Sequence, residues 1–293
     1  MSSWLKSAVI DANSATYTIL DVLKKNIGGY RKARSRQLVH ASDATKPGFC
    51  PREWALMDYY KVTPPDEFIS AGLQATFDVG LMTEHIFVNK WIGNHAVGTW
   101  ACTRCGEVKH MVTKPGMGCT KHQKCQWEYQ QAVFVSQEYG VSGALDLLVN
   151  LGAPKLFVTE IKIIKVEDFA ELLVPLPEHR LRTGIYLKLI SDSTNPLKDA
   201  INLQEARVCY VSRGFGKKNV STGTILPFKE FVIKRDDSVC LPILNRAKKV
   251  KIFRETGAFP CGICNTALDT RAKNCPVNKQ CFGGAHPPTQ IKE

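Results

Sequence analysis

Three charged residues stand within two short apolar segments in the middle of the chain. Asp146 lies in the segment 141–150, and Glu160 and Lys162 lie in the segment 155–164. Both segments are rich in strand-forming residues, and a cluster of Asn, Gly and Pro residues separates them. The sequence therefore predicts a β-hairpin that carries two carboxylates and one ammonium group.

A turn centred near Ala153 would place Asp146 directly opposite Glu160 in this hairpin. Side chains alternate along a strand, so Glu160 and Lys162 point to the same face. Charged groups are rare on an apolar sheet unless they are paired or bind a metal ion. Paired carboxylates hold Mg²⁺ or Mn²⁺, and such ions drive phosphodiester hydrolysis. The alternative interpretation is a buried ion pair between Lys162 and a carboxylate.

The composition favours a polyanionic partner, and nucleic acid above all. The 293 residues carry a formal net charge of +12, and an excess of basic residues attracts phosphate groups. No apolar stretch is long enough to span a bilayer, and the N-terminal residues lack the apolar region of a signal peptide. We therefore expect a cytoplasmic protein without a membrane partner.

A polar segment rich in Gly, Lys, Cys and His interrupts the periodic part of the chain. Cys102 and Cys105 form one metal knuckle in it, and Cys119 begins a second. Eleven cysteines without a secretory signal favour metal ligation over disulfides. The spacing predicts a structural zinc site. His122 fits the knuckle spacing as the fourth ligand, whereas Cys125 fits a preference for thiolates; we favour His122.

Helices and strands alternate around these motifs. Apolar spacing predicts helices at 3–26, 51–61, 67–94, 177–191 and 241–253. Runs of strand-forming residues predict strands at 131–138, 141–150, 155–164 and 201–211. This order predicts a mixed α/β core. We expect an N-terminal helical segment, a helical part of the core, a zinc insertion, the central core and a cysteine-rich tail, at 1–45, 46–97, 98–128, 129–255 and 256–293.

The order of Asp146 and then Glu160-x-Lys162 resembles the PD-(D/E)xK nuclease superfamily. The resemblance implies a restriction-endonuclease-like fold, in which helices flank a mixed central sheet. It implies that the carboxylates and the carbonyl of Ile161 hold Mg²⁺ or Mn²⁺. Lys162 would then orient or help to deprotonate the attacking water and stabilise the charge that develops on the phosphate.

Two flanking helices are similar to the RecB-type branch of this superfamily. Gly80 is followed five residues later by His85, and in that branch the histidine is a metal ligand; a core histidine is the alternative. Further on, His179, Arg182 and Tyr186 share one helical stripe. The RecB-like pattern has Gln and Tyr where this chain has Arg182 and Tyr186. The resemblance implies a site role for both, and the Arg could hold a DNA phosphate bidentately.

A lone upstream cysteine, Cys50, is paired in the sequence with a distant cysteine-rich tail. Cys275 and Cys281 match the closing motif of the iron–sulfur nucleases, the Cas-four-type enzymes and the AddB nuclease domain. That resemblance implies a 4Fe–4S cluster held by four thiolates. Either Cys261 or Cys264 supplies the remaining ligand, and we favour Cys264. The alternative is a zinc site built from the four C-terminal cysteines without Cys50.

The combined resemblance implies a phage-encoded exonuclease that acts on single-stranded DNA ends in the host cytoplasm, with a zinc ribbon inserted in its core. A helicase, recombination or replication partner fits such an enzyme. The alternative is a non-catalytic nucleic-acid-binding protein, or a subunit of a DNA-processing complex, on a nuclease scaffold. The zinc ribbon, the basic charge and Arg182 favour that alternative, whereas the intact Asp, Glu-x-Lys and His85 set favours the enzyme.

Overall fold

The computed structural model describes residues 29–31, 35–63, 67–214 and 227–283. The chain divides into two compact units, residues 1–34 with 64–82, and residues 35–63 with 83–293. The helix expected at 3–26 lies outside the described residues. No helix in the described ranges is both long and apolar enough to cross a membrane.

In the first unit, a short strand replaces part of an expected helix. β1 (Gly29–Arg31) pairs antiparallel with β3 (Glu67–Ile69), so the prediction of one helix over 67–94 is wrong at its start. The helix α5 (Ala71–Ile86) follows and continues into the second unit. There it passes into a π-helical turn, η1 (Phe87–Ile92), and a 3₁₀ turn, η2 (Gly93–His95).

The second unit is built on a central mixed sheet. Seven strands form it, in the order β12-β11-β10-β9-β4-β5, with β6 also paired to β4. Their bounds are β4 (Ala96–Cys102), β5 (Val108–Thr113), β6 (Trp127–Gln130), β9 (Leu147–Val149), β10 (Phe157–Ile164), β11 (Glu205–Ser212) and β12 (Phe228–Lys234). β10 and β11 are parallel, and the other pairs are antiparallel. The expected mixed α/β core is confirmed.

The segment 98–128 is more regular than its composition suggests. It was expected to be a separate insert without periodicity, but most of β4, all of β5 and the first half of β6 lie within it and join the central sheet. Polar and metal-ligating residue types hide strand alternation here, because side chains that ligate a metal need not follow the apolar pattern of a sheet face. The cysteine-bearing segment is therefore an extension of the central sheet.

A second, three-stranded sheet consists of β2 (Val39–His40), β8 (Val141–Leu145) and β7 (Ala132–Ser136). The expected single strand over 141–150 is thus divided between two sheets. β8 pairs with β7, whereas β9 pairs with β10, and the one residue between β8 and β9 is Asp146. The chain changes sheets at the residue that was expected to do chemistry.

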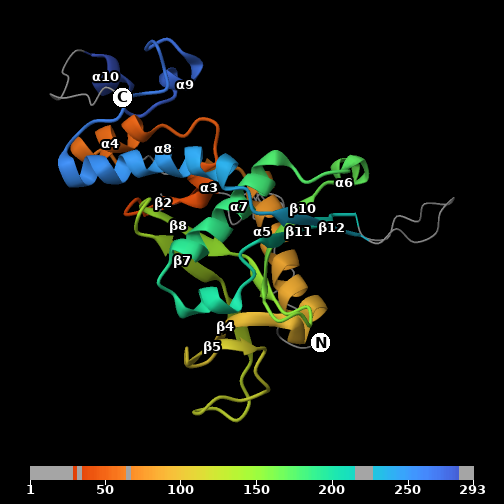
Figure 1. The fold of residues 1–293 in the computed structure, drawn as a ribbon. Coiled ribbons are helices and arrows are strands. Elements are labelled where there is room, and N and C mark those ends of the chain that lie inside the picture. The colour runs from red at the N-terminus through yellow and green to blue at the C-terminus, as the bar shows by residue number, and fades with distance from the viewer. Residues whose placement is uncertain (1–28, 32–34, 64–66, 215–226, 284–293) are drawn as a thin grey trace, which may run out of the picture. The chain divides into compact units, whose positions relative to one another are not determined.

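Helices cover these sheets and hold the C-terminal region. They are α3 (Ala41–Ala44), α4 (Pro51–Tyr59), α6 (Val166–Glu171), α7 (Pro177–Asp192), η3 (Pro196–Ala200), α8 (Asp237–Thr256), α9 (Thr270–Lys273) and α10 (Asn278–Phe282). α4 and α8 lie side by side, and α9 and α10 lie above this pair in the view of Figure 1, with α10 in contact with α4. α8 begins where Asp236 accepts a hydrogen bond from the Ser238 amide and ends at Gly257, whose φ of 76° is left-handed.

The helix α7 packs against strands of both sheets and carries several of the expected site residues. Its side chains of Ile185, Leu187, Leu189 and Ile190 are fully buried in the main apolar core. Each such side chain contributes about 1.5–3 kcal/mol when it leaves water. This burial fixes the rotation of the helix, and with it the positions of Arg182 and Tyr186.

Candidate functional site

Asp146 stands opposite Glu160 at the point where β8 ends and β9 begins. Leu147 pairs with Thr159 in the ladder between β9 and β10, so Asp146 and Glu160 are the next opposing positions. This is the register that a turn centred near Ala153 predicts. The Oδ2 atom of Asp146 accepts a hydrogen bond from the Ile161 backbone amide at 2.9 Å, which fixes the carboxylate against β10.

The Lys162 ammonium lies among three oxygen atoms. Its Nζ atom is 2.5 Å from Glu160 Oε1 and 3.5 Å from Asp146 Oδ2, and it donates to the Ile161 carbonyl at 3.0 Å. These are three of the four groups that the family resemblance implies as ligands of a divalent cation, the fourth being His85. The hairpin therefore brings both carboxylates, the carbonyl and the ammonium together.

Glu160 is a deeply buried carboxyl group with incomplete hydrogen bonding. The residue is 1% exposed, and its Oε1 atom also lies 3.3 Å from an Arg182 guanidinium nitrogen. Its Oε2 atom is buried without a hydrogen-bond partner. Burial, with the nearby Asp146 charge, raises the pKa of Glu160 to about 7 against the opposing effect of Lys162 and Arg182. A buried oxygen without a partner is a candidate ligand atom.

The helix α7 supplies Arg182, Tyr186 and His179 to one side of this hairpin. The Tyr186 ring packs on Gly143 of β8, where an added Cβ would lie 2.8 Å from the ring. Burial and the nearby charges of Glu160 and Asp146 raise the pKa of Tyr186, so its hydroxyl stays protonated. His179 is also buried, and its Nδ1 atom is 2.8 Å from the Tyr210 hydroxyl.

Glu84, one residue before the expected ligand His85, is coupled to Asp146. The Nε2 atom of Gln131 donates to Glu84 Oε1 at 3.1 Å and to Asp146 Oδ1 at 3.4 Å. Burial, followed by the Asp146 charge, raises the pKa of Glu84 to about 7. The His85 side chain is exposed, and its Nδ1 atom is 3.4 Å from Nδ2 of Asn89. The structure thus links Glu84 to Asp146 through Gln131, whereas the ring of the adjacent His85 contacts Asn89.

Sequence reasoning missed both Glu84 and Gln131. A signal for Glu84 was present, because Glu84 precedes the buried pair Phe87 and Val88 by one helical turn. The sequence holds no comparable signal for Gln131, which follows β6 and meets Glu84 across 47 positions of the chain.

The first cysteine group has the geometry of a single-ion site. The ligand atoms of Cys102, Cys105, Cys119 and His122 all lie within 4.8 Å of one another. The Sγ atom of Cys119 is 3.6 Å from that of Cys102 and 3.5 Å from Nδ1 of His122. Zn–S bonds of about 2.3 Å at tetrahedral angles place sulfur atoms roughly 3.8 Å apart. The cluster could therefore hold a zinc ion.

The neighbouring thiol of Cys125 differs from that of Cys102 in its protonation. Burial, followed by its hydrogen bonds with neighbouring thiols, raises the pKa of Cys125 to about 12. Burial opposes ionisation of Cys102 too, but backbone hydrogen bonds from Cys105 and Arg104 lower the pKa of Cys102 to about 6. The pKa of the Cys105 thiol, a member of the cluster, is raised as well, so the choice of His122 as the fourth member rests on the close grouping of the ligand atoms.

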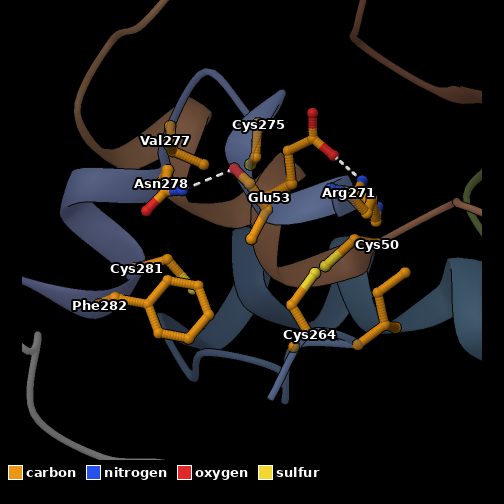
Figure 2. A pocket seen from close by; sticks show the side chains of 12 residues that line it. Cys50, Glu53, Cys264, Arg271, Cys275, Val277, Asn278, Cys281 and Phe282 are labelled. Carbon is orange, nitrogen blue, oxygen red and sulfur yellow. Dashed lines mark hydrogen bonds and ion pairs between the residues drawn. The ribbon is translucent and has the colours of Figure 1, made fainter. Parts of the chain in front are cut away.

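The second cysteine group lines a pocket between α4 and the C-terminal helices (Figure 2). Cys50, Cys264, Cys275 and Cys281 all border it, and it encloses roughly 300 Å³, part of which is open to solvent. Figure 2 shows the side chains of Cys50 and Cys264 pointing toward each other. Cys261 is exposed and is not among the lining residues.

Spacing distinguishes this pocket from the Cys102 cluster. Among the described residues, no three thiols of the pocket lie within 4.8 Å of one another. At the edge of the pocket, Arg271 pairs with Glu53 and donates from Nε to the Gly48 carbonyl at 2.7 Å. A basic side chain is thus fixed beside the thiols.

Comparisons with known proteins give little guidance. No protein-family model and no curated protein matches the chain. The crystal structure of SSO0001 is 14% identical with a TM-score of 0.36, over 75% of this chain and 78% of that one. The alkaline exonuclease LHK-Exo from Laribacter hongkongensis, also solved with dAMP, is 13% identical with a TM-score of 0.39, over 75% and 89%. Scores this low carry no inference about activity.

Proposed function

We propose that the chain is a divalent-metal-dependent nuclease of the PD-(D/E)xK type. The observation that carries this proposal is the gathering of Asp146 and Glu160 around the ammonium of Lys162, with Glu84 linked to Asp146 through Gln131. Both glutamate carboxyls have a pKa raised to about 7, chiefly by burial and next by the Asp146 charge. Groups of this kind are typical of functional sites, because further positive charge is needed to hold them ionised.

The donor set fits Mg²⁺ or Mn²⁺. Asp146, Glu160 and the Ile161 carbonyl offer hard oxygen atoms, and the buried Oε2 of Glu160 has no other partner. We assign Glu84 to the place that the resemblance gives to His85. A bound ion would polarise the phosphoryl oxygen and lower the pKa of a water molecule.

The chain's own cations would then act on the nucleic acid. Lys162 stands beside the ligand oxygens, where it can orient the attacking water and neutralise charge on the phosphate. Arg182 has a partly exposed side chain, and its guanidinium group could contact a DNA phosphate bidentately. Tyr186 packs on Gly143 and would border the site with a hydroxyl group that stays protonated.

We further propose two accessory metal groups. A 4Fe–4S cluster would be held by Cys50, Cys264, Cys275 and Cys281, and it would tie the C-terminal region to α4. Zinc would be held by the Cys102, Cys105, Cys119 and His122 cluster. The net charge of +12 supports DNA as the substrate. We propose single-stranded ends as its form, and a phage-encoded enzyme that works with a helicase, recombination or replication partner in the host cytoplasm.

A cleavage assay with the purified full chain tests this proposal. End-labelled single-stranded DNA, duplex DNA and RNA are incubated with Mg²⁺ or Mn²⁺. We expect stepwise loss of single-stranded DNA, which Asp146→Ala and Lys162→Ala abolish and which Glu171→Gln, an exposed carboxylate on α6, leaves unchanged. No cleavage of any of these forms by the wild type would overturn the proposal.

A non-catalytic DNA-binding protein is the second candidate, and the Arg182–Glu160 contact favours it. A guanidinium group fixed on the metal-binding carboxylate competes with a cation for the same oxygen. If the wild type binds single-stranded DNA but does not cleave it with either ion, this second function is the correct one. If cleavage appears only with a helicase or another partner added, the chain is a subunit of a processing complex.

A further inference from the structure

One strand connects the candidate zinc cluster to the carboxylate centre. β6 (Trp127–Gln130) begins two residues after Cys125 and ends one residue before Gln131. In the ladder with β4, Trp127 pairs with Cys102 and Gln130 pairs with Thr99. The start of β6 thus lies beside a cluster cysteine, and the residue after its end lies beside Asp146 and Glu84.

The start of β6 is fixed firmly within the cysteine-bearing segment. The indole nitrogen of Trp127 donates to the carbonyls of Gly116 and Gly118, at 3.0 and 3.2 Å. Trp127 is buried, and the Lys109 ammonium lies 4.7 Å from its ring centre. The Thr103 amide donates to the Gln126 carbonyl at 3.0 Å. The loop that carries Cys119 therefore determines where β6 starts.

Midway along β6, Tyr129 reaches the strand that follows Asp146. Its hydroxyl accepts from the Leu148 amide at 3.3 Å and donates to the Val97 carbonyl at 3.4 Å. The ring crosses β4 at Gly98, where an added Cβ would lie 2.7 Å from it. It also meets the ring of the fully buried Trp100 edge-on, with centroids 5.2 Å apart. Movement of β6 would consequently move β9.

At the end of β6, the side chain of Gln131 joins two carboxylates, those of Glu84 and Asp146. The single Nε2 amide of Gln131 donates to both, so it holds the two carboxylates side by side. An amide in this role orients ligand oxygens in the way that outer-shell partners commonly do in metal sites.

We propose that Gln131 is a positioning residue for the catalytic cation, and that the Cys102, Cys105, Cys119 and His122 cluster sets its place through β6. The cysteine-bearing segment is then part of the active-site framework, and loss of its metal weakens cation binding at the carboxylates. This inference rests on the proposed nuclease function, because it assumes that Glu84 and Asp146 bind a common divalent ion.

Mn²⁺ affinity provides a readout other than activity. The full-length protein, loaded at the cysteine cluster, is titrated with Mn²⁺, and the free ion is followed by electron paramagnetic resonance. Gln131→Met keeps the side-chain length and removes the amide. We expect its Mn²⁺ affinity to fall about tenfold, at the lower end of the loss for an outer-shell partner. Glu128→Gln, at an exposed position of β6, should bind Mn²⁺ like the wild type.

Cys119→Ser tests the link to the cluster. We expect it to lose its zinc and to weaken Mn²⁺ binding, and we expect Gln131→Met to add little in the double variant, because both changes act on one contact. Should Cys119→Ser fail to fold, the Gln131→Met result still decides the positioning role. Unchanged Mn²⁺ affinity in Gln131→Met overturns the inference, as does unchanged affinity in a folded, zinc-free Cys119→Ser. A wild type that binds no Mn²⁺ would instead overturn the proposed function.

Discussion

Lys162 and Glu160 form an ion pair of 2.5 Å inside the protein, between two residues that point to the same face of β10. Because the Glu160 carboxyl is buried, removal of Lys162 would take away the nearer of its two cationic partners and leave the Arg182 guanidinium at 3.3 Å. We expect Lys162→Met to lower the free energy of unfolding by about 3 kcal/mol in metal-free buffer. Chemical denaturation measures this loss. Lys165→Met, at an exposed position, should change it by less than about 0.5 kcal/mol; equal effects would show that the pair contributes nothing.

Variants of Glu84 and His85 test which of these two neighbouring residues acts at the proposed metal site. Gln131 couples Glu84 to Asp146, whereas the His85 side chain is exposed. We expect Glu84→Gln to reduce the rate of DNA cleavage about 100-fold, since lost metal-assisted stabilisation is worth several kcal/mol. His85→Gln should lose far less. Steady-state cleavage rates compare the two variants. A larger loss of rate in His85→Gln than in Glu84→Gln would show that His85 is the metal ligand.

The cysteine pocket predicts a visible cofactor. Protein purified without oxygen should be brown and absorb near roughly 400 nm, as iron–sulfur proteins do. Cys50→Ser should lose iron and colour, because Cys50 lines the pocket. Cys261→Ser should keep both, because Cys261 is exposed and outside it. Metal analysis supplies the measurement, and a colourless wild type with two zinc ions and no iron would contradict the cluster assignment.

The lowered pKa of His179 predicts how the free energy of unfolding depends on pH. Burial, followed by the charges of Lys162 and Arg182, lowers the pKa of His179 to about 3, against about 6.5 in the unfolded chain. Between these values the unfolded state binds the extra proton, so stability is lost as pH falls through this range. One such proton changes stability by about 1.4 kcal/mol per pH unit at most.

Denaturation of wild type and His179→Gln between about pH 7 and pH 5 isolates this contribution, because the other titrating groups are common to both. We expect the wild type to lose more stability than the variant, by up to about 2 kcal/mol at pH 5. Parallel curves would contradict a buried, neutral His179.

The sequence predicted the hairpin well because its physical rules are local. A cluster of turn residues fixed the centre of the loop, and the two-residue period of a strand then set Asp146 against Glu160. The same holds for α7, expected at 177–191 and found at Pro177–Asp192. The two-residue period could not reveal that the chain passes from one sheet to the other at Asp146, since both sheets bury their strands.

The sequence alone did not predict which residues share a face in the helix before the hairpin. A continuous α-helix over 67–94 would place His85 on one face with Val88 and Ile92. Residues Phe87–Ile92 instead form a π-helical turn, which shifts the phase of everything beyond it. The missed Gln131 has a different cause, since its contacts join segments that are distant in the chain. Polar residues chosen for long-range contacts leave no periodic pattern.

The most direct test of a divalent-metal centre is its location. Crystals of the protein soaked with Mn²⁺ allow the ion to be located from its anomalous scattering. We predict a peak within coordination distance of Asp146, Glu160 and the Ile161 carbonyl, near Glu84, with the Lys162 ammonium displaced from these oxygens. The absence of Mn²⁺ from this position in crystals that hold the ion elsewhere, with Lys162 still paired to Glu160, would contradict the account.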